Sequence, residues 1–293
     1  MNRPVLLYPH IPKTGGTSLT NVIYNEYNDS TGCREKAGHF SEGIYYYPGE
    51  PDLPYRWGGP WAWTFRDHRH YRTIQSSSIV RALRREDLRA VVGHFAFGMH
   101  ALIDRPTTYV TIFRHPLERI ISLFYHLKRW PSYDQNESLL KGAAYRVLAP
   151  EATLEEFVHN YRLRELDNDQ TRRVAGEDPE FGRCTRSLLQ IAKSNIEQHF
   201  SFVGTTERFE ETLRGAADVL GWSSQHIARK MLVNENRDPT LSIQSITKEA
   251  ILERNELDLE LYSFANEWLN DRLSAAAPPS KVSPTSGTLR SRR

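Results

Sequence analysis

The chain has 293 residues, 39% of them hydrophobic and 11% aromatic, which is enough to bury a substantial core and excludes a wholly disordered chain. Residues 275–293 carry four of the 38 basic residues and none of the 36 acidic ones, so residues 1–274 have 34 basic side chains against 36 acidic ones and a formal net charge of −2. This balance argues against general affinity for nucleic acids.

The cysteines and the apolar segments limit the cellular compartment and the kinds of covalent or metal chemistry to be expected. Cys33 and Cys184 are too few for a disulfide framework, so two free thiols are the simpler interpretation, and one bridge between them stays open. No stretch has the spacing of metal ligands, so no metal site is expected. The first expected strand begins close to Met1, and no apolar run approaches the roughly 18 residues of a membrane span. These features predict a soluble, cytoplasmic protein without a membrane-spanning segment.

The first expected elements are a strand, a tight loop and a helix. An apolar run at residues 5–8 predicts the strand, and apolar residues recur at helical spacing from Leu19 to Tyr27. The loop between them, residues 9–18, reads PHIPKTGGTS. Its adjacent glycines let the main chain fold closely around a ligand, a hydroxyl side chain can cap the helix, and the N–H groups at the helix start attract negative charge. With the ammonium group of Lys13, this loop predicts an anion-binding site.

The next region, from about residue 40 to residue 75, is rich in aromatic residues and proline. The apolar residues from Tyr45 to Arg72 follow neither helical nor strand periodicity. The simpler interpretation is an ordered surface insertion whose aromatic side chains pack on the main domain. The sharper interpretation is a wall that binds an acceptor, because exposed Trp faces suit sugar rings and the arginines of this segment suit an anionic partner.

A second strand–loop–helix unit follows. Residues 81–89 are basic and are expected to be helical, and residues 90–92 predict a short buried strand that ends at Gly93-His94. Residues 107–113 are β-branched and aromatic, and predict a strand that ends at Arg114. Pro116 suits the first position of the next helix, where its missing N–H does no harm.

The remaining elements keep the same alternation. We expect a helix at 187–199, a strand at 200–204, a helix at 207–220 and a closing helical region at 247–273. Repeated strand-to-helix alternation predicts an α/β fold with a P-loop-like parallel β-sheet flanked by helices on both faces. We expect a single domain over residues 1–274, followed by a flexible basic tail over residues 275–293.

Two clusters of polar residues carry the chemistry. In the P-loop of nucleoside-triphosphate-binding proteins, lysine directly follows the second glycine of the motif, whereas here Lys13 precedes both glycines. Arg114, at the carboxyl end of a strand, lies where open α/β sheets bind ligands. Ser122 lies about 9 Å along the helix from Pro116, at about 1.5 Å per residue. An arginine and a hydroxyl in this arrangement suit a second phosphate.

In these motifs the chain resembles the PAPS-dependent sulfotransferases, where PAPS is 3′-phosphoadenosine 5′-phosphosulfate, and within them the heparan/dermatan 2-O-sulfotransferase type. The resemblance covers roughly residues 4–270 and includes Gly93-His94, residues 192–196 and residues 202–207. It implies the following cofactor-binding residues: Lys13, Thr14, Gly15, Gly16, Thr17 and Ser18 in a 5′-phosphosulfate loop, Arg114 and Ser122 at the 3′-phosphate, and Arg237 in a basic loop that closes over the nucleotide.

The resemblance also implies a mechanism. An acceptor hydroxyl attacks the sulfur of PAPS in line and the nucleotide PAP leaves, while Lys13 and the loop N–H groups stabilise the developing charge without a metal. His94 directly follows a strand, where the family has a catalytic histidine, and is the expected base. His10, next to the loop, is its competitor. The animal members of the family carry a further histidine two residues earlier, where this chain has Val92.

The predicted function is therefore transfer of a sulfuryl group from PAPS to an acceptor hydroxyl, on a carbohydrate. Two other classes stay open. A non-catalytic module would retain the cradle to bind a sulfated or phosphorylated glycan. A P-loop kinase-like enzyme would bind ATP with Mg²⁺, although the position of Lys13 counts against it. Asn168, Gln170 and Arg172 either line the acceptor cleft or make structural hydrogen bonds, and the structural role is preferred.

Overall fold

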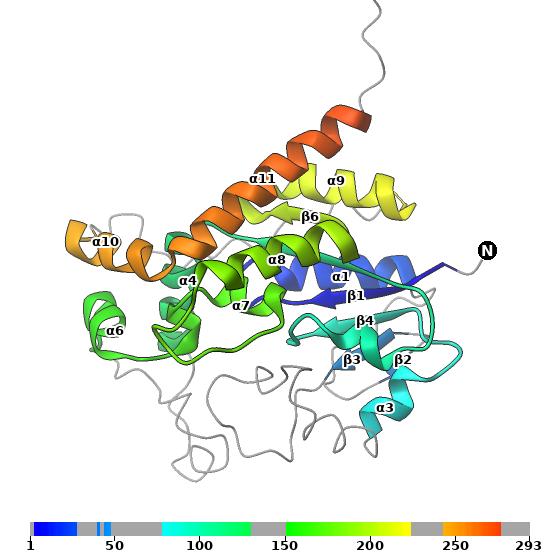
Figure 1. Cartoon of the computed structure of the whole chain (residues 1–293), viewed down its shortest axis with the longest axis horizontal. Helices are drawn as coiled ribbons and strands as arrows, with labels where there is room; N and C mark the ends of the chain where they lie inside the picture. Colours follow the sequence, from blue (N-terminus) through cyan, green and yellow to red (C-terminus); the bar gives the residue numbers. More distant parts are fainter. Residues whose placement is uncertain are drawn as a thin grey trace, which may run out of the picture.

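A parallel β-sheet occupies the centre of the molecule (Figure 1). The computed structural model describes residues 3–27, 40–41, 44–47, 78–129, 151–223 and 243–276. Within these residues the sheet has the strand order β2-β3-β4-β1-β5-β6. All neighbouring strands pair in parallel except β2 and β3, which are antiparallel. The strands are β1 (Val5–Pro9), β2 (Phe40–Ser41), β3 (Ile44–Tyr47), β4 (Ala90–Gly93), β5 (Thr107–Phe113) and β6 (Phe200–Thr205).

The central strands are continuous apolar or β-branched runs because both of their faces are covered. Every residue of β1 and β4 is buried, as is expected of parallel strands between two helical layers. Alternate residues of β1 enter different cores, so Leu7 packs with the core beneath α8 (Arg186–His199), whereas Leu6 packs with the core beneath α1 (Gly16–Tyr27). Helices therefore cover both faces of the sheet, which confirms the predicted fold class.

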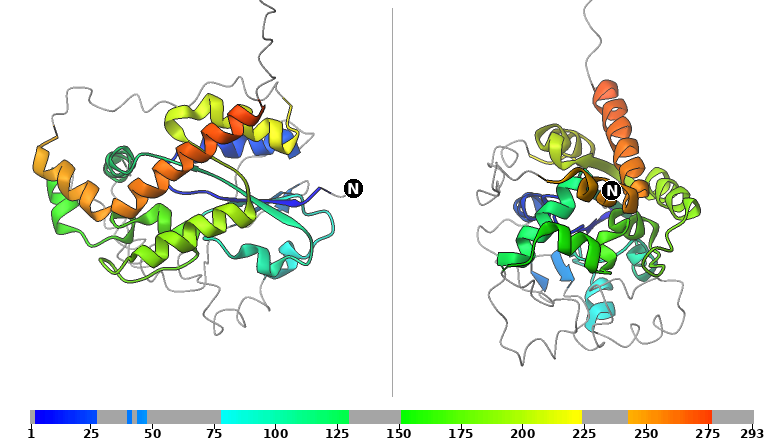
Figure 2. Two further views of the ribbon diagram at one scale, coloured as in Figure 1. Left: turned by 45° about the horizontal axis from the view of Figure 1, so that its top comes forward. Right: turned by 90° about the vertical axis from the view of Figure 1, so that its left-hand side faces the viewer.

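Figure 2 shows this layered arrangement from two further sides. One layer has α1 with α9 (Phe209–Leu220), and the other has α7 (Asp169–Ala175) with α8. The long helix α11 (Glu256–Ala276) crosses next to β6 and contributes residues to both cores. The remaining helical elements are α3 (Ser78–Leu83), α4 (Pro116–Arg129), α6 (Leu154–Asn160), α10 (Ser245–Arg254) and the 3₁₀ turns η2 (Met99–Leu102), η4 (Arg164–Leu166) and η5 (Thr206–Arg208).

A separate apolar cluster joins α4, α6 and α10 beside the carboxyl edge of the sheet. Ile120 and Phe124 of α4 pack there against Phe157 of α6. A capping box starts α6, because Thr153 and Glu156 each accept a hydrogen bond from the other's backbone N–H, at 3.1 and 2.8 Å. This cluster fixes α4, the helix that follows Arg114.

The structure corrects two expectations about individual elements. Residues 44–47 form a strand that pairs with β4, although no strand periodicity was expected from Tyr45 onward. The helix expected over residues 81–89 ends at Leu83 and is followed by turns. The expected closing helical region is confirmed and consists of two helices that meet at Asn255, whose side-chain amide donates to the carbonyls of Leu166 and Ile251.

Some expectations fall outside the described residues. Residues 48–77, which make up most of the aromatic segment, and residues 277–293, which make up nearly all of the basic tail, are among these. The single-domain boundary stays a prediction. Among the helices that the structure describes, none combines the length and the apolar character that crossing a bilayer requires.

Asn168 is one of the residues that join α7 to α11. Its main chain is left-handed, with φ +50°, and its side-chain oxygen accepts hydrogen bonds from the N–H groups of Leu257 and Asp258 at 2.9 and 3.2 Å. Its own N–H donates to the Asn255 side chain at 3.1 Å. Asparagine tolerates this conformation and caps helices well, so the local sequence suits both tasks.

We predict that Asn168→Ala lowers the free energy of unfolding by about 2–4 kcal/mol, because it removes three buried hydrogen bonds, two accepted by the side-chain oxygen and one donated to Asp167, and strains the left-handed residue. Urea denaturation followed by circular dichroism measures this. Gln198→Ala is the control, since that exposed amide only bonds Ser194, and its change should stay within about 0.5 kcal/mol. Equal effects of the two substitutions would contradict the assignment.

Candidate active site

The loops that follow β1, β4 and β5 meet at the carboxyl edge of the sheet. Pro9 is in register with Gly93, and the Thr111 hydroxyl of β5 donates to the Pro9 carbonyl at 3.1 Å. Lys13, His94 and Arg114 follow these strand ends, so the structure brings all three predicted residues to one edge. This is where parallel α/β sheets bind ligands.

The loop after β1 is an anion cradle by its main-chain geometry. Lys13 and Gly15 are both left-handed, with φ +70° and +81°. Helix α1 begins immediately afterwards at Gly16, and the first N–H groups of any α-helix have no acceptor within it. Successive turned N–H groups at a helix start form a concave site for anions. The left-handed Lys13 costs about 1–2 kcal/mol, and such strain is typical of functional sites.

The hydroxyl side chains of this loop differ in their availability. Thr14 is fully buried, and its hydroxyl donates to the Ile11 carbonyl at 2.9 Å, so its side chain shapes the loop. Any contact of Thr14 with a ligand therefore falls to its main chain. Thr17 is exposed and Ser18 is partly exposed at the start of α1. Their side chains are the better placed of the three to reach a ligand.

Gly16 is required by packing rather than by its main-chain conformation. A Cβ at this position would lie 1.9 Å from two atoms of the His10 ring, Cδ2 and Nε2. The His10 ring also stacks on Tyr8, with centroids 5.8 Å apart, and on His94, with centroids 4.4 Å apart and planes at 27°. The absence of a side chain at Gly16 thus lets His10 lie against the cradle and hold His94.

His94 has one defined hydrogen-bond partner in the described part of the site. Its Nδ1 lies 2.8 Å from the main-chain oxygen of His10. A carbonyl oxygen only accepts, so Nδ1 carries the proton and Nε2 of the neutral ring has a free lone pair. The His10 carbonyl therefore selects the tautomer in which Nε2 can accept a proton.

The electrostatic surroundings keep both histidines neutral. The imidazole of His94 contacts solvent, yet desolvation by the surrounding protein, with the Arg173 charge as the second cause, lowers its pKa to about 4. The pKa of His10 lies well below its ordinary value, mainly through burial and then through the neighbouring His94, Arg173 and Lys13. His94 is consequently unprotonated near neutral pH.

Arg114 joins the second predicted cluster to the cradle. Its guanidinium donates to the Lys13 carbonyl at 3.2 Å and lies 3.8 Å from the Glu118 carboxylate. Glu118 and Ser122 follow Arg114 at intervals of four residues, so Ser122 lies one helical turn beyond Glu118 on the same side of α4. The two predicted phosphate sites are thus adjacent in space.

The end of β6 ties both loops together. The Thr206 hydroxyl lies 2.6 Å from the Thr14 carbonyl and 3.1 Å from the Phe113 carbonyl, and can donate to either. The Glu207 carboxylate accepts a hydrogen bond from the His115 N–H at 3.1 Å. The sequence resemblance included residues 202–207 without assigning them a role, and these contacts give that segment one.

A buried ionic cluster lies behind the site. Asp169 on α7 is fully buried and lies 3.0 Å from the Arg119 guanidinium and 3.5 Å from that of Arg173. Arg119, on α4, is also fully buried. A pattern of apolar residues does not reveal a buried arginine, because the partner carboxylate lies 50 residues away.

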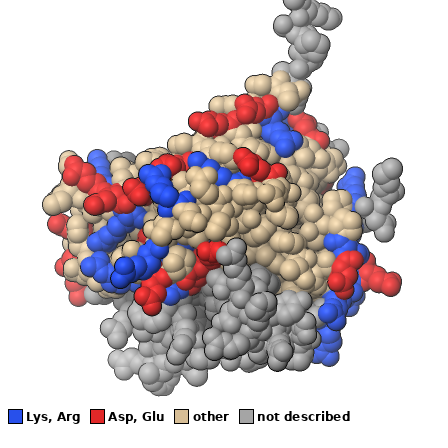
Figure 3. Space-filling model, in the orientation of Figure 1, with Lys and Arg blue, Asp and Glu red and all other residues tan. Residues whose placement is uncertain are grey.

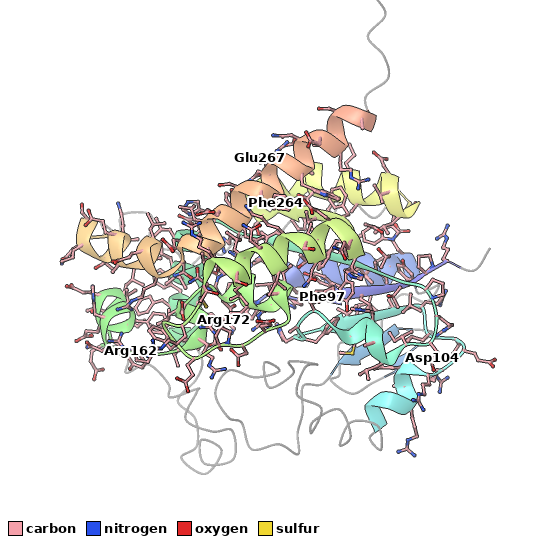
Figure 4. All side chains as sticks on the ribbon, in the orientation of Figure 1. Phe97, Asp104, Arg162, Arg172, Phe264 and Glu267 are labelled. Carbon is pink, nitrogen blue, oxygen red and sulfur yellow. The ribbon has the colours of Figure 1, made fainter. Side chains whose placement is uncertain are left out.

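Three polar residues of α7 and its flank have the structural role that was preferred for them. Asn168 caps α11, and Gln170 hydrogen-bonds the main chain of Arg114. Arg172, labelled in Figure 4, is fully buried between α7 and the following loop and pairs with Asp167 and Asp178. Arg237 lies outside the described residues, and its role stays a prediction, as do the ligand contacts of the other site residues.

Together, the sheet, the loop at the start of α1 and the basic residue after β5 define an α/β protein of the P-loop-like class, with the main-chain geometry of an anion site at the carboxyl edge of its sheet. The match to a family of known proteins is more specific. A family model described as "Sulfotransferase family" matches residues 2–265, and the chain belongs to this family.

Comparison with individual proteins agrees with this family. The chain is 25% identical to heparan-sulfate 6-O-sulfotransferase 2 of Danio rerio and 23% identical to heparan-sulfate 6-O-sulfotransferase 1 of Homo sapiens, over 93% and 92% of its length. It spans 59% and 66% of these two relatives. Both carry 6-O in their names, whereas the motifs were likened to the 2-O type. A crystal structure of a sulfotransferase from Alicyclobacillus acidocaldarius matches 90% of this chain and 96% of its own, with 15% identity and a TM-score of 0.41.

We predict that Gly16→Ala destabilises the protein by about 1–3 kcal/mol, because the new methyl group would overlap the His10 ring. Chemical denaturation of the single variants and of His10→Ala/Gly16→Ala forms a double-mutant cycle. The smaller residue at position 10 makes room for the methyl group, so Gly16→Ala should cost much less in the His10→Ala background. The same loss in both backgrounds would show that the His10 ring is not what excludes a side chain at Gly16.

Proposed function

We propose that this sulfotransferase transfers a sulfuryl group from PAPS to a hydroxyl group of a carbohydrate. The observation that supports this most is the hydrogen bond between the Arg114 guanidinium and the Lys13 carbonyl, at 3.2 Å. It makes the two anion-binding clusters neighbours, which suits a nucleotide that carries phosphate groups at both its 5′ and 3′ positions. A nucleoside triphosphate needs one continuous phosphate cradle instead.

The residues of the cradle suit the sulfated end of the donor. Its main-chain oxygens at His10, Lys13 and Thr14 are all turned toward protein donors, namely His94, Arg114 and Thr206. Carbonyl oxygens in those positions do not face an anion, whereas the N–H groups at the start of α1 do not have acceptors in the helix. Lys13, Gly15, Gly16, Thr17 and Ser18 would hold the 5′-phosphosulfate, with Thr14 contributing its main chain.

His94 is the proposed general base. Nε2 is the ring nitrogen with the free lone pair, since Nδ1 donates to the His10 carbonyl. As the acceptor oxygen bonds to sulfur, its proton passes to Nε2, and the sulfur–oxygen bond to the 5′-phosphate breaks with its electron pair on the phosphate oxygen. His10 contributes its carbonyl and its stacked ring, so its proposed role is to orient His94.

The charge that develops on the leaving phosphate needs a fixed positive environment. Lys13 and the N–H groups of the cradle provide one that is already organised before reaction, which is commonly among the largest contributions to catalysis. Arg114 and Ser122 would hold the 3′-phosphate and thus the line of attack. Lys13 is partly buried, so solvent screens its charge less than it screens a surface lysine.

A glycan acceptor is supported by the names of the two relatives, which both act on heparan sulfate by name. On the face shown in Figure 3, Lys and Arg side chains are intermixed with those of Asp and Glu.

The cytoplasmic location and the lack of a metal requirement stay predictions. The two alternatives, a non-catalytic glycan-binding module and an ATP-dependent kinase-like enzyme, are not favoured, because the family match is to transferases of sulfate.

We predict that the protein transfers ³⁵S-labelled sulfate from PAPS to a heparan-type oligosaccharide, and that Lys13→Ala and His94→Ala each lower the rate by about 10²–10⁴-fold. Scintillation counting of the separated glycan measures transfer, with circular dichroism to confirm the fold. Lys248→Ala and His159→Ala are matched controls on α10 and α6, and should retain the wild-type rate.

Different failures of this experiment have different meanings. Transfer by His94→Ala near the wild-type rate would exclude His94 as the base. Transfer to lipids or phenols but not to glycans would contradict the acceptor class and leave the donor assignment intact. A wild-type protein that transfers sulfate from PAPS to none of the glycans, lipids and phenols tested would contradict the proposed reaction.

The lowered pKa of His94 makes a separate prediction about pH. A base acts in its unprotonated form, and His94 with a pKa of about 4 stays unprotonated well below the ordinary value of 6.5. We therefore expect the acid limb of kcat/KM to have its midpoint below 6.5, toward 4. Initial rates between pH 4.5 and 8 test this, with far-ultraviolet circular dichroism at each pH. A midpoint at or above 6.5 would contradict the prediction.

A further inference from the structure

The side chain of Gln170 makes two reciprocal hydrogen bonds to the main chain of Arg114. Its Oε1 accepts from the Arg114 N–H at 2.9 Å, and its Nε2 donates to the Arg114 carbonyl at 2.9 Å. Gln170 is fully buried on α7, 56 residues further along the chain. The amide thus pairs with Arg114 as the opposite residue of a neighbouring strand would.

This pairing comes at the point where β5 ends. Phe113 is the last residue of β5 and still pairs with β6, in register with Thr205, whereas Arg114 leads into α4 at Pro116. A residue that leaves a sheet has main-chain groups that need new partners. Gln170 supplies a partner for the N–H and for the carbonyl of Arg114. It thus fixes the two peptide planes on either side of the Arg114 Cα, from which the side chain with its guanidinium extends.

Gln170 is itself anchored from the C-terminal helix. The Asp258 carboxylate of α11 accepts hydrogen bonds from the N–H of Gln170 at 3.1 Å, from the N–H of Thr171 at 2.7 Å and from the Thr171 hydroxyl at 2.8 Å. Asp258 is fully buried. The start of α7 is therefore fixed to α11, and a continuous set of hydrogen bonds runs from Asp258 through Gln170 to Arg114.

We propose that Gln170 is a positioning residue for the 3′-phosphate. It fixes the main chain of Arg114 and does not itself contact the phosphate. The inference rests on the proposed function, because it takes Arg114 as the group that binds the 3′-phosphate. Both polar atoms of the Gln170 side chain are engaged by Arg114, so the amide acts through that residue. Its removal should reduce recognition of the 3′-phosphate and spare recognition of the 5′-phosphate.

The test compares two nucleotides that differ only in the 3′-phosphate. Isothermal titration calorimetry measures the Kd of PAP and of adenosine 5′-phosphate for the full chain. In Gln170→Leu the Kd of PAP should rise about tenfold or more, while that of adenosine 5′-phosphate stays within about twofold. Gln170→Glu keeps the size of the side chain and the acceptor for the Arg114 N–H but sets a carboxyl oxygen against the Arg114 carbonyl, and should also raise the Kd of PAP more than that of adenosine 5′-phosphate.

Asn195→Leu is the matched control. In the wild-type protein the Asn195 side-chain amide also contacts α7, since it donates to the main-chain carbonyls of Val174 (2.9 Å) and Ala175 (3.3 Å). These lie at the opposite end of that helix from Gln170. Loss of this partly buried amide contact should lower stability without changing the ratio of the two Kd values. A second control is Gln170→Leu in an Arg114→Ala background, where no further loss for PAP is expected.

The outcomes separate this inference from the function on which it rests. A wild-type protein that binds PAP no better than adenosine 5′-phosphate would contradict both. A wild-type preference for PAP that survives in Gln170→Leu and Gln170→Glu would overturn only the role of Gln170. Equal weakening of both nucleotides, or the same change in Asn195→Leu, would show that Gln170 merely stabilises the fold. Further loss in the Arg114→Ala background would show that it does not act through Arg114.

Discussion

The parallel register of β1 with β4 and β5 is the constraint on which the site depends. Because Pro9 is level with Gly93, and the Thr111 hydroxyl bonds the Pro9 carbonyl, the three strands end side by side. Residues that are far apart in sequence are thereby brought to one edge of the sheet. The helices on both faces bury β1 and β4 completely and β5 from its second residue onward, so the buried core holds the strand ends.

Contacts between the loops then set the positions of the individual groups. His94, Arg114 and Thr206 each lie within hydrogen-bond distance of a main-chain oxygen of the first loop. The loop is therefore held through its carbonyl groups. At the start of α1, the N–H of Ser18 donates to the Gly15 carbonyl at 3.1 Å, and the N–H groups that precede it are the ones proposed to face an anion. The same arrangement selects the tautomer of His94, so the proposed anion site and the proposed base depend on one segment of main chain.

Much of this could be predicted from the sequence because its signals are local. The strand before Lys13, the helix after it and the position of Pro116 are each encoded within a few residues. The pairing of Gln170 with Arg114 could not be predicted, since it joins residues 56 apart and glutamine has no distinctive pattern. The strand at residues 44–47 was missed because it is short and its tyrosines show no clear alternation.

The central claim is that the cradle at Lys13 and the cluster at Arg114 together bind one nucleotide phosphorylated at two positions. A crystal structure of the chain with PAP bound tests it most directly. The 5′-phosphate is predicted to lie on the N–H groups at the start of α1, within reach of Lys13, with the 3′-phosphate on Arg114 and Ser122. A nucleotide bound elsewhere, or one whose 3′-phosphate points away from Arg114, would contradict the account.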